Sequence, residues 1–81
     1  MNPNQLIQEG NIFRETDKTS VREEYVAWAT KVALYLEEKY PQTSIAEKTK
    51  LISQHLFMAY RVDSNYLELM GILKGICEYE Q

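Results

Sequence analysis

The sequence has a single cysteine and a single histidine, and only three glycines and two prolines, among its 81 residues. Cys77 alone cannot form an intramolecular disulfide, and no apolar signal segment follows a basic start, so we expect a cytoplasmic location. His55 and Cys77 do not supply the set of ligands that zinc requires, and the scattered glycines form no phosphate-binding loop. The sequence therefore predicts neither a metal site nor a cofactor.

Long apolar runs are also missing. No segment approaches the roughly 18 apolar residues that a membrane-spanning helix needs, because Thr30 and Lys31 interrupt the run between YVAWA and VALYL. The polar side of this amphipathic stretch is acidic, whereas helices that lie on lipid surfaces are rich in lysine and arginine. We expect no contact with a membrane.

The chain lacks an excess of basic residues. Its formal net charge is -3, with a pI near 5.1. Non-specific affinity for nucleic acid comes from clustered lysine and arginine, and the cluster of Lys48, Lys50 and Arg61 is diluted by Glu47 and by neutral residues. A phosphate-binding surface is disfavoured.

What the chain has is the composition of a small globular domain, with 44% hydrophobic and 26% charged residues. A chain of this size buries only about 60% of the surface that its unfolded form exposes. We therefore expect one domain over residues 1–81. Because such cores are small, self-association is a further hypothesis.

Residues 20–40 form the longest amphipathic stretch. At about 100° per residue its large apolar side chains fall on one stripe, opposite its acidic ones. The stripe consists of Val21, Tyr25, Trp28, Ala29, Val32, Leu36 and Tyr40. Ser20 and Glu23 have the spacing of a capping box, and Pro41 disfavours helical geometry at the residue before it. The sequence predicts one helix from Ser20 to Tyr40.

A short N-terminal helix is predicted to begin after Asn2, which acts as its cap, with Pro3 in the first position. One side of this helix carries Leu6, Gly10 and Phe13. Gly10 weakens a helix by about 1 kcal/mol relative to alanine, unless a neighbouring backbone lies close to it.

Two more helices are predicted after Pro41. The first covers residues 44–61, opens with a capping box of Ser44 and Glu47, and has a core stripe of Ile45, Ile52, Leu56, Ala59 and Tyr60. The second covers residues 65–81 and is capped by Asp63 or Ser64. Its apolar face consists of Tyr66, Leu69, Met70, Leu73, Ile76 and Cys77.

Catalytic residues are not suggested by the pattern. His55 and Cys77 form a conceivable nucleophilic pair, but no third residue that would orient them is apparent. The neighbouring pairs Glu23/Glu24 and Glu37/Glu38 point about 100° apart on a helix and share no site. We therefore expect no enzymatic activity.

Gly71 and Gly75 are the residues most informative about partner binding, because both lie on the side of the last predicted helix opposite its core face. Together they lower the helix propensity by roughly 2 kcal/mol relative to alanine. This cost favours the interpretation that they form a groove against which another backbone lies. The alternative is that they are two surface glycines that the helix tolerates. Other apolar residues lie outside the predicted core. The predicted partner-binding surface consists of Ala27, Leu34, Phe57, Leu67, Gly71 and Gly75, with Phe57 either exposed or packed by the N-terminal helix.

Three segments carry a resemblance to a known type of protein. They are LIQEG at 6–10, YVAWATKVALYLEEKYPQTSIAEK at 25–48 and YLELMGILKGI at 66–76. Together they resemble an uncharacterised small helical module of bacterial, mainly Firmicutes-type, proteins. The resemblance implies a stand-alone or N-terminal accessory module, some members of which are encoded near phage-defence or mobile-element genes. It carries over no catalytic residue.

The sequence therefore predicts an all-α domain, a compact up-down bundle of three main helices and a short N-terminal one. We expect a protein-binding or regulatory module whose partner is another protein or a second copy of the chain. The alternative hypothesis is a small phage- or bacteria-encoded regulator that binds nucleic acid or a nucleotide.

Overall fold

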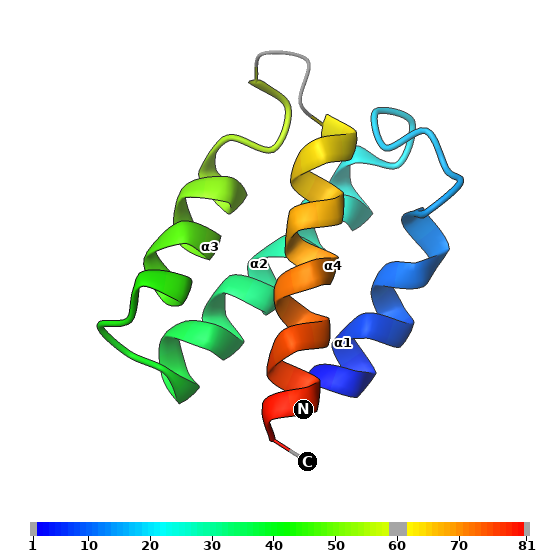
Figure 1. The fold of residues 1–81 in the computed structure, drawn as a ribbon. Helices are drawn as coiled ribbons and strands as arrows, with labels where there is room; N and C mark the ends of the chain where they lie inside the picture. Colours follow the sequence, from blue (N-terminus) through cyan, green and yellow to red (C-terminus); the bar gives the residue numbers. More distant parts are fainter. Residues whose placement is uncertain (1, 59–61, 81) are drawn as a thin grey trace.

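A computed structural model describes residues 2–58 and 62–80, and this part of the chain folds into helices without any strand (Figure 1). The α-helices are α1 (Pro3–Gly10), α2 (Arg22–Lys39), α3 (Ser44–Gln54) and α4 (Val62–Tyr79), and a turn of 3-10 helix, η1 (Asn11–Phe13), follows α1. The predicted all-α bundle is confirmed. The predicted core residues Ala59 and Tyr60, and the predicted helix end at Arg61, lie outside the described residues.

Helix α1 begins as the sequence predicts. The side-chain oxygen of Asn2 accepts a hydrogen bond of 2.8 Å from the backbone N–H of Gln5, and Pro3 occupies the first helical position. This bond satisfies one of the N–H groups that a helix start leaves without a partner.

The predicted capping box at Ser20 is wrong. The hydroxyl of Ser20 donates to the carbonyl oxygen of Asp17 at 2.7 Å, within a turn in which the Asp17 carboxylate accepts from the N–H and the hydroxyl of Thr19. Serine and aspartate side chains often stabilise such turns in competition with helix capping. Helix α2 therefore begins at Arg22 without a side-chain cap. It ends at Lys39, one residue before the predicted end at Tyr40, which is its C-cap.

The boundaries of α3 also differ from those predicted. Its cap is Thr43, whose hydroxyl oxygen accepts from the N–H of Ala46 at 3.2 Å, so the capping box at Ser44 is wrong. The helix ends at Gln54, well before the predicted end at Arg61, and just beyond it the side-chain amide of Asn65 donates to the carbonyl oxygens of His55 at 3.1 Å and Leu56 at 3.3 Å. Together with the bond of 3.2 Å from the N–H of Met58 to the carbonyl oxygen of His55, these bonds connect the turn after α3 to the start of α4.

Helix α4 starts earlier than predicted. It includes Val62, so Asp63 and Ser64 lie in its first turn and neither is its cap. Asp63 has a different role there, since its carboxylate accepts a hydrogen bond of 2.9 Å from the ammonium group of Lys18.

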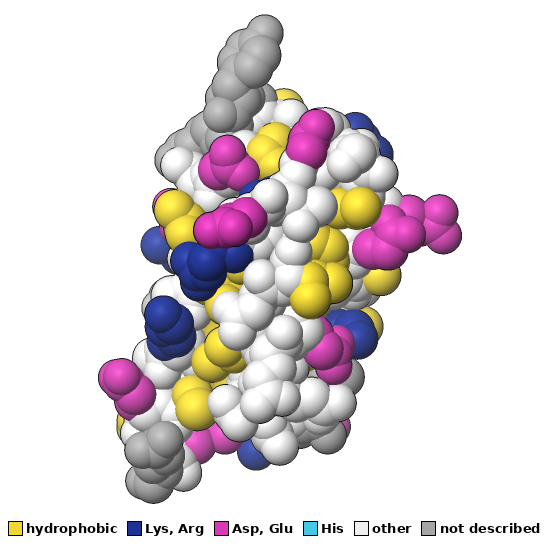
Figure 2. Space-filling view, turned by 90° about the vertical axis from the view of Figure 1, so that its right-hand side faces the viewer, with side chains coloured by type: hydrophobic (Ala, Val, Ile, Leu, Met, Phe, Trp, Pro, Cys, Tyr) yellow, Lys and Arg dark blue, Asp and Glu magenta, His cyan; other side chains and the backbone are white. Residues whose placement is uncertain are grey.

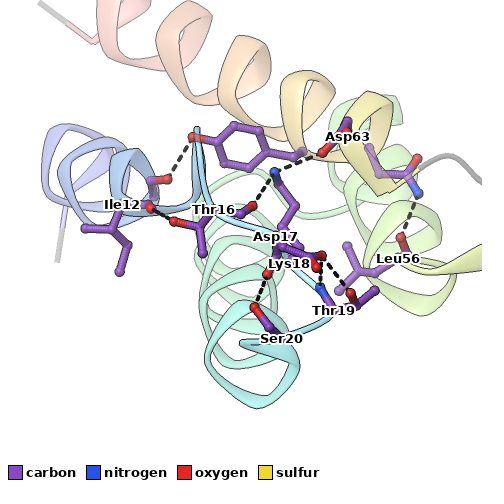
Figure 3. A network of polar contacts seen from close by, with 11 residues as sticks. Ile12, Thr16, Asp17, Lys18, Thr19, Ser20, Leu56 and Asp63 are labelled. Carbon is purple, nitrogen blue, oxygen red and sulfur yellow. Dashed lines mark hydrogen bonds and ion pairs between the residues drawn. The ribbon is translucent and has the colours of Figure 1, made fainter.

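Lys18 is an unusual core residue, because its side chain is only 3% exposed. Figure 3 shows its ammonium group between Asp63 on α4 and the carbonyl oxygen of Thr16, which lies 3.4 Å away. The ammonium group also lies 4.7 Å from the ring centre of Tyr66. Buried charges are tolerated when they are paired in this way. The contacts attach the loop between α1 and α2 to the start of α4.

The core contains apolar side chains from every helix. Its buried members are Leu6, Phe13, Tyr25, Trp28, Ala29, Val32, Tyr35, Leu36, Ile52, Leu56, Tyr66, Leu69, Met70, Leu73 and Ile76. Helices α2 and α4 meet through aromatic rings, with the ring centres of Trp28 and Tyr66 separated by 5.8 Å. The periodicity predicted most of these residues. The assignment of Ile45 to the core is wrong, because it is 41% exposed and Ala46 and Thr49 face inward instead.

Helix α1 is held in the bundle by two hydrogen bonds from buried aromatic side chains to its backbone. The indole N–H of Trp28 donates to the carbonyl oxygen of Leu6 at 2.9 Å, and the hydroxyl of Tyr66 donates to that of Gly10 at 2.8 Å. A Cβ atom on Gly10 would lie only 2.4 Å from Cζ2 of Trp28. Gly10 is therefore required by the close approach of an indole ring.

Candidate docking groove

The two glycines of α4 lie in an apolar groove between the start of α3 and the second half of α4. The groove has a volume of about 400 Å³ and is lined by Tyr40, Ile45, Gly71, Ile72, Gly75, Ile76 and Tyr79. In Figure 1, α3 and α4 run on neighbouring sides of the bundle. Most of the lining side chains are aliphatic. The groove is therefore suited to an apolar ligand, from which its walls would exclude water.

Gly71 and Gly75 are both exposed, as their position opposite the core face predicts. A Cβ atom added at either position would meet nothing within 4 Å. The contrast with Gly10 is direct, because there the same atom would collide with a buried ring. No contact within the described chain explains why α4 has glycine at these two positions.

Alanine at either position is therefore expected to stabilise the isolated protein. The Gly71→Ala and Gly75→Ala variants should each raise the free energy of unfolding by about 0.5–1 kcal/mol, because alanine has the higher helix propensity and fits the open space. Urea unfolding followed by circular dichroism measures this change. A loss of stability in either variant would mean that the chain itself needs the glycine.

The walls of the groove contain large apolar side chains that reach solvent. Ile45 is 41% exposed and Tyr79 is 79% exposed. Leu67, one helical turn before Gly71, is 56% exposed, but it lines a different depression, formed with the loop between α1 and α2 and the start of α4. Sequence reasoning missed Ile45, Ile72 and Tyr79 as lining residues. Periodicity assigns a residue to one face of its own helix and does not say which helix lies beside that face.

Next to the Tyr40 side of the groove, hydrogen bonds join the C-terminal part of α2 to the end of α4. The carboxylate of Glu80 accepts from the hydroxyl of Tyr40 and, at 3.1 Å, from that of Tyr35. The bond to Glu80 raises the pKa of Tyr40 to about 12, and burial raises that of Tyr35 to about 12. The bond from Tyr40 lowers the pKa of Glu80 below its ordinary value of 4.5. These contacts hold the Tyr40 wall in place.

The Tyr40–Glu80 contact is expected to strengthen the fold only within a window of pH. Because the pKa of Glu80 is lowered on folding, its contribution is lost as the pH falls below about 4.5. Because the pKa of Tyr40 is raised, its contribution is lost as the pH rises from about 10 to about 12. In the Tyr40→Phe variant the pKa of Glu80, measured by carboxyl NMR, should rise toward its ordinary value. An unchanged pKa would show that Tyr40 does not bind this carboxylate.

The other predicted surface residues do not join the groove. Leu34 lies in a separate depression with Lys31, Tyr35, Glu38 and Lys39, and Ala27 lies in another with Ile12, Phe13 and Trp28. Phe57 is half-buried: its ring packs edge-on against Tyr25, with ring centres 5.9 Å apart, and the Arg22 guanidinium lies 4.0 Å from its ring centre. Ala27, Leu34 and Phe57 therefore do not form one continuous patch with Gly71 and Gly75.

The face on the α1 side of the molecule differs from the groove. Figure 2 shows acidic and basic side chains interspersed over this face, with apolar side chains in small groups between them. The described residues of this face therefore form neither a field of one sign nor a single broad apolar patch.

His55 and Cys77 are separated in the structure. His55 follows α3, where its backbone oxygen binds Asn65 near the start of α4, and its ring nitrogen lies 3.0 Å from the sulfur of Met58. Cys77 is twelve residues beyond Asn65 on α4, or about 18 Å along the helix. The two side chains do not form the pair considered from the sequence. Over residues 2–58 and 62–80, no three potential ligands gather around a metal position.

None of the helices in the described part of the chain combines the length and the apolar character needed to cross a membrane. Comparisons of the chain with protein-family models, with curated proteins and with solved structures find no match.

Proposed function

We propose that this chain is a protein-binding module that receives a helix of a partner protein in the groove between α3 and α4. The observation that carries the proposal is the pair of glycines at positions 71 and 75. Each costs helix stability, and neither is required by any contact within the described chain.

The chemistry of the groove favours a helix as the ligand. Glycine removes the side chains that would keep a second backbone at the usual distance of 8–10 Å between helix axes. The aliphatic walls formed by Ile45, Ile72 and Ile76 suit the apolar anchor residues of an amphipathic helix. Tyr79 adds an exposed aromatic ring at the rim, a residue type that is enriched where proteins bind each other.

The nucleic-acid alternative gains no comparable support. Several cations are already engaged by the protein itself, since Lys18 pairs with Asp63, Lys31 pairs with Glu9 and Arg22 lies over the ring of Phe57. The formal net charge of the chain is -3.

Site-specific photo-crosslinking in the native host tests the proposal. A photoreactive phenylalanine analogue is placed at Tyr79, which lines the groove, and in a control at Leu34, which is 59% exposed in a different depression. We expect a defined adduct from position 79 and none from position 34. Adding Gly75→Leu, whose Cβ atom meets nothing within 4 Å and whose longer side chain would occupy the groove, should abolish the adduct. Equal adducts from both positions, or an adduct that survives Gly75→Leu, would contradict the proposal.

A further inference from the structure

The turn that follows α3 carries two adjacent side chains of metal-binding types. His55 is the C-cap of α3, and its ring nitrogen Nδ1 lies 3.0 Å from the sulfur of Met58. Both residues are exposed, Met58 by 59%. An imidazole nitrogen and a thioether sulfur are therefore side by side and accessible from solvent.

Hydrogen bonds to the backbone hold this turn in place. The N–H of Met58 donates to the carbonyl oxygen of His55 at 3.2 Å, which closes the turn. The side-chain amide of Asn65 donates to the same oxygen at 3.1 Å and to that of Leu56 at 3.3 Å, which attaches the turn to α4. None of these bonds uses the imidazole or the thioether. The two side chains are thus brought together by contacts that leave their metal-binding atoms available, as a preorganised site requires.

The two ligand types restrict the metal that fits them. Thioether sulfur is a soft ligand that favours Cu(I), whereas imidazole binds zinc, copper, iron and nickel. Copper is the metal that both ligands favour. Zinc sites are built from thiolate, imidazole and carboxylate groups and usually have at least three of them, and no three such groups gather among the residues that the structure describes. The pair therefore suits Cu(I) better than a divalent metal.

The distance between the two ligand atoms is close to that which a bound metal requires. With bond lengths near those of zinc, about 2.0 Å to nitrogen and about 2.3 Å to sulfur, the two atoms lie about 3.7 Å apart at an N–metal–S angle of about 120°, and about 4.3 Å apart in a linear arrangement. The contact of 3.0 Å between Nδ1 of His55 and the sulfur of Met58 must therefore widen by roughly 0.7–1.3 Å. Rotation about the side-chain bonds of a flexible, exposed methionine provides this movement.

We propose that His55 and Met58 form a binding site for one Cu(I) ion, with Nδ1 and the thioether sulfur as its ligands. The ring stays neutral and keeps its proton on Nε2, because Nδ1 must be unprotonated to bind a metal. The turn lies at the opposite end of α3 from the groove (Figure 1). Metal binding at this turn is therefore independent of the proposed function of the groove.

Anaerobic titration with Cu(I), followed by NMR of the methionine methyl groups and the histidine ring, tests the inference. The thiol of Cys77 would compete for the ion, because sulfur of this kind is also a soft ligand, so the full-length Cys77→Ser variant is used. One equivalent of Cu(I) should shift the signals of Met58 and His55 together. The methyl signal of Met70, which is 2% exposed, should not move.

Each ligand should depend on the other. When Met58→Leu is added, the His55 ring should no longer respond to one equivalent of Cu(I), and when His55→Ala is added, the Met58 methyl group should no longer respond. Circular dichroism verifies that each variant is folded, as expected because the bonds that fix the turn use backbone oxygens. A Met58 response that survives His55→Ala, or no response in folded Cys77→Ser protein, would overturn the proposal.

Titration with Zn(II) tests the choice of metal. Because the thioether is a poor match for zinc, Zn(II) should leave the Met58 methyl signal unchanged at the concentration at which Cu(I) shifts it. An equal shift with both metals would overturn the assignment to copper.

Discussion

Replacing Gly10 with alanine is expected to destabilise the protein by about 2 kcal/mol. The new Cβ atom would lie 2.4 Å from Cζ2 and 2.7 Å from Cε2 of Trp28, and 3.0 Å from the sulfur of Met70. Overpacking of this kind costs up to about 3 kcal/mol, while the gain in helix propensity returns at most about 1 kcal/mol. The clash therefore outweighs the gain in helix propensity, and the net effect on the free energy of unfolding is destabilising.

Thermal unfolding measures this effect. For a chain of this size, a loss of about 2 kcal/mol lowers Tm by roughly 8–16 °C. Gly71→Ala is the matched control, since it makes the same chemical change in a helix where the added atom meets nothing. The two substitutions should shift Tm in opposite directions. A Gly10→Ala variant as stable as the original protein would show that α1 is not held against Trp28 as described.

The second large effect is expected at Trp28, which is 3% exposed and connects α2 to both α1 and α4. Phenylalanine at this position removes the N–H that binds the carbonyl oxygen of Leu6 and leaves part of the ring volume empty. An unsatisfied buried acceptor costs about 1–3 kcal/mol and the lost volume adds to it. We expect Trp28→Phe to lower the free energy of unfolding by about 2–3 kcal/mol in urea titrations.

Trp28→Phe should also reduce the cost of Gly10→Ala, because it removes the ring atom closest to the new Cβ. The double variant should then be more stable than the sum of the two single effects predicts, with a coupling free energy of about 1 kcal/mol or more. Strict additivity would show that Gly10 and Trp28 do not constrain each other.

The all-α architecture and most of the core could be predicted from the sequence, because both follow from apolar residues spaced at the helical period. The stop before Pro41 and the Asn2 cap follow from local chemistry in the same way. Predictions failed where a hydroxyl or amide had more than one local partner. Ser20 binds Asp17, and Thr43 replaces Ser44 as cap.

Long-range contacts account for the remaining differences. The turn that follows α3 at Gln54 is bonded to Asn65, eleven residues beyond that helix end, and the need for glycine at position 10 depends on a ring eighteen residues away. The exposed position of Gly71 and Gly75 follows from periodicity alone. The groove itself requires Ile45 of α3 to lie beside α4, and the period of a single helix contains no information on that arrangement.

The measurement that tests the central claim most directly uses an amphipathic helix selected from a displayed peptide library for binding to the protein. Its Kd is measured for the Gly71→Ala/Gly75→Ala double variant and for the original protein. The claim is that α4 has glycine at these positions to admit another helix. It predicts that the double variant is more stable toward unfolding and yet binds roughly tenfold or more weakly, a loss of about 1.4 kcal/mol or more. An unchanged Kd in the stabilised variant would contradict it.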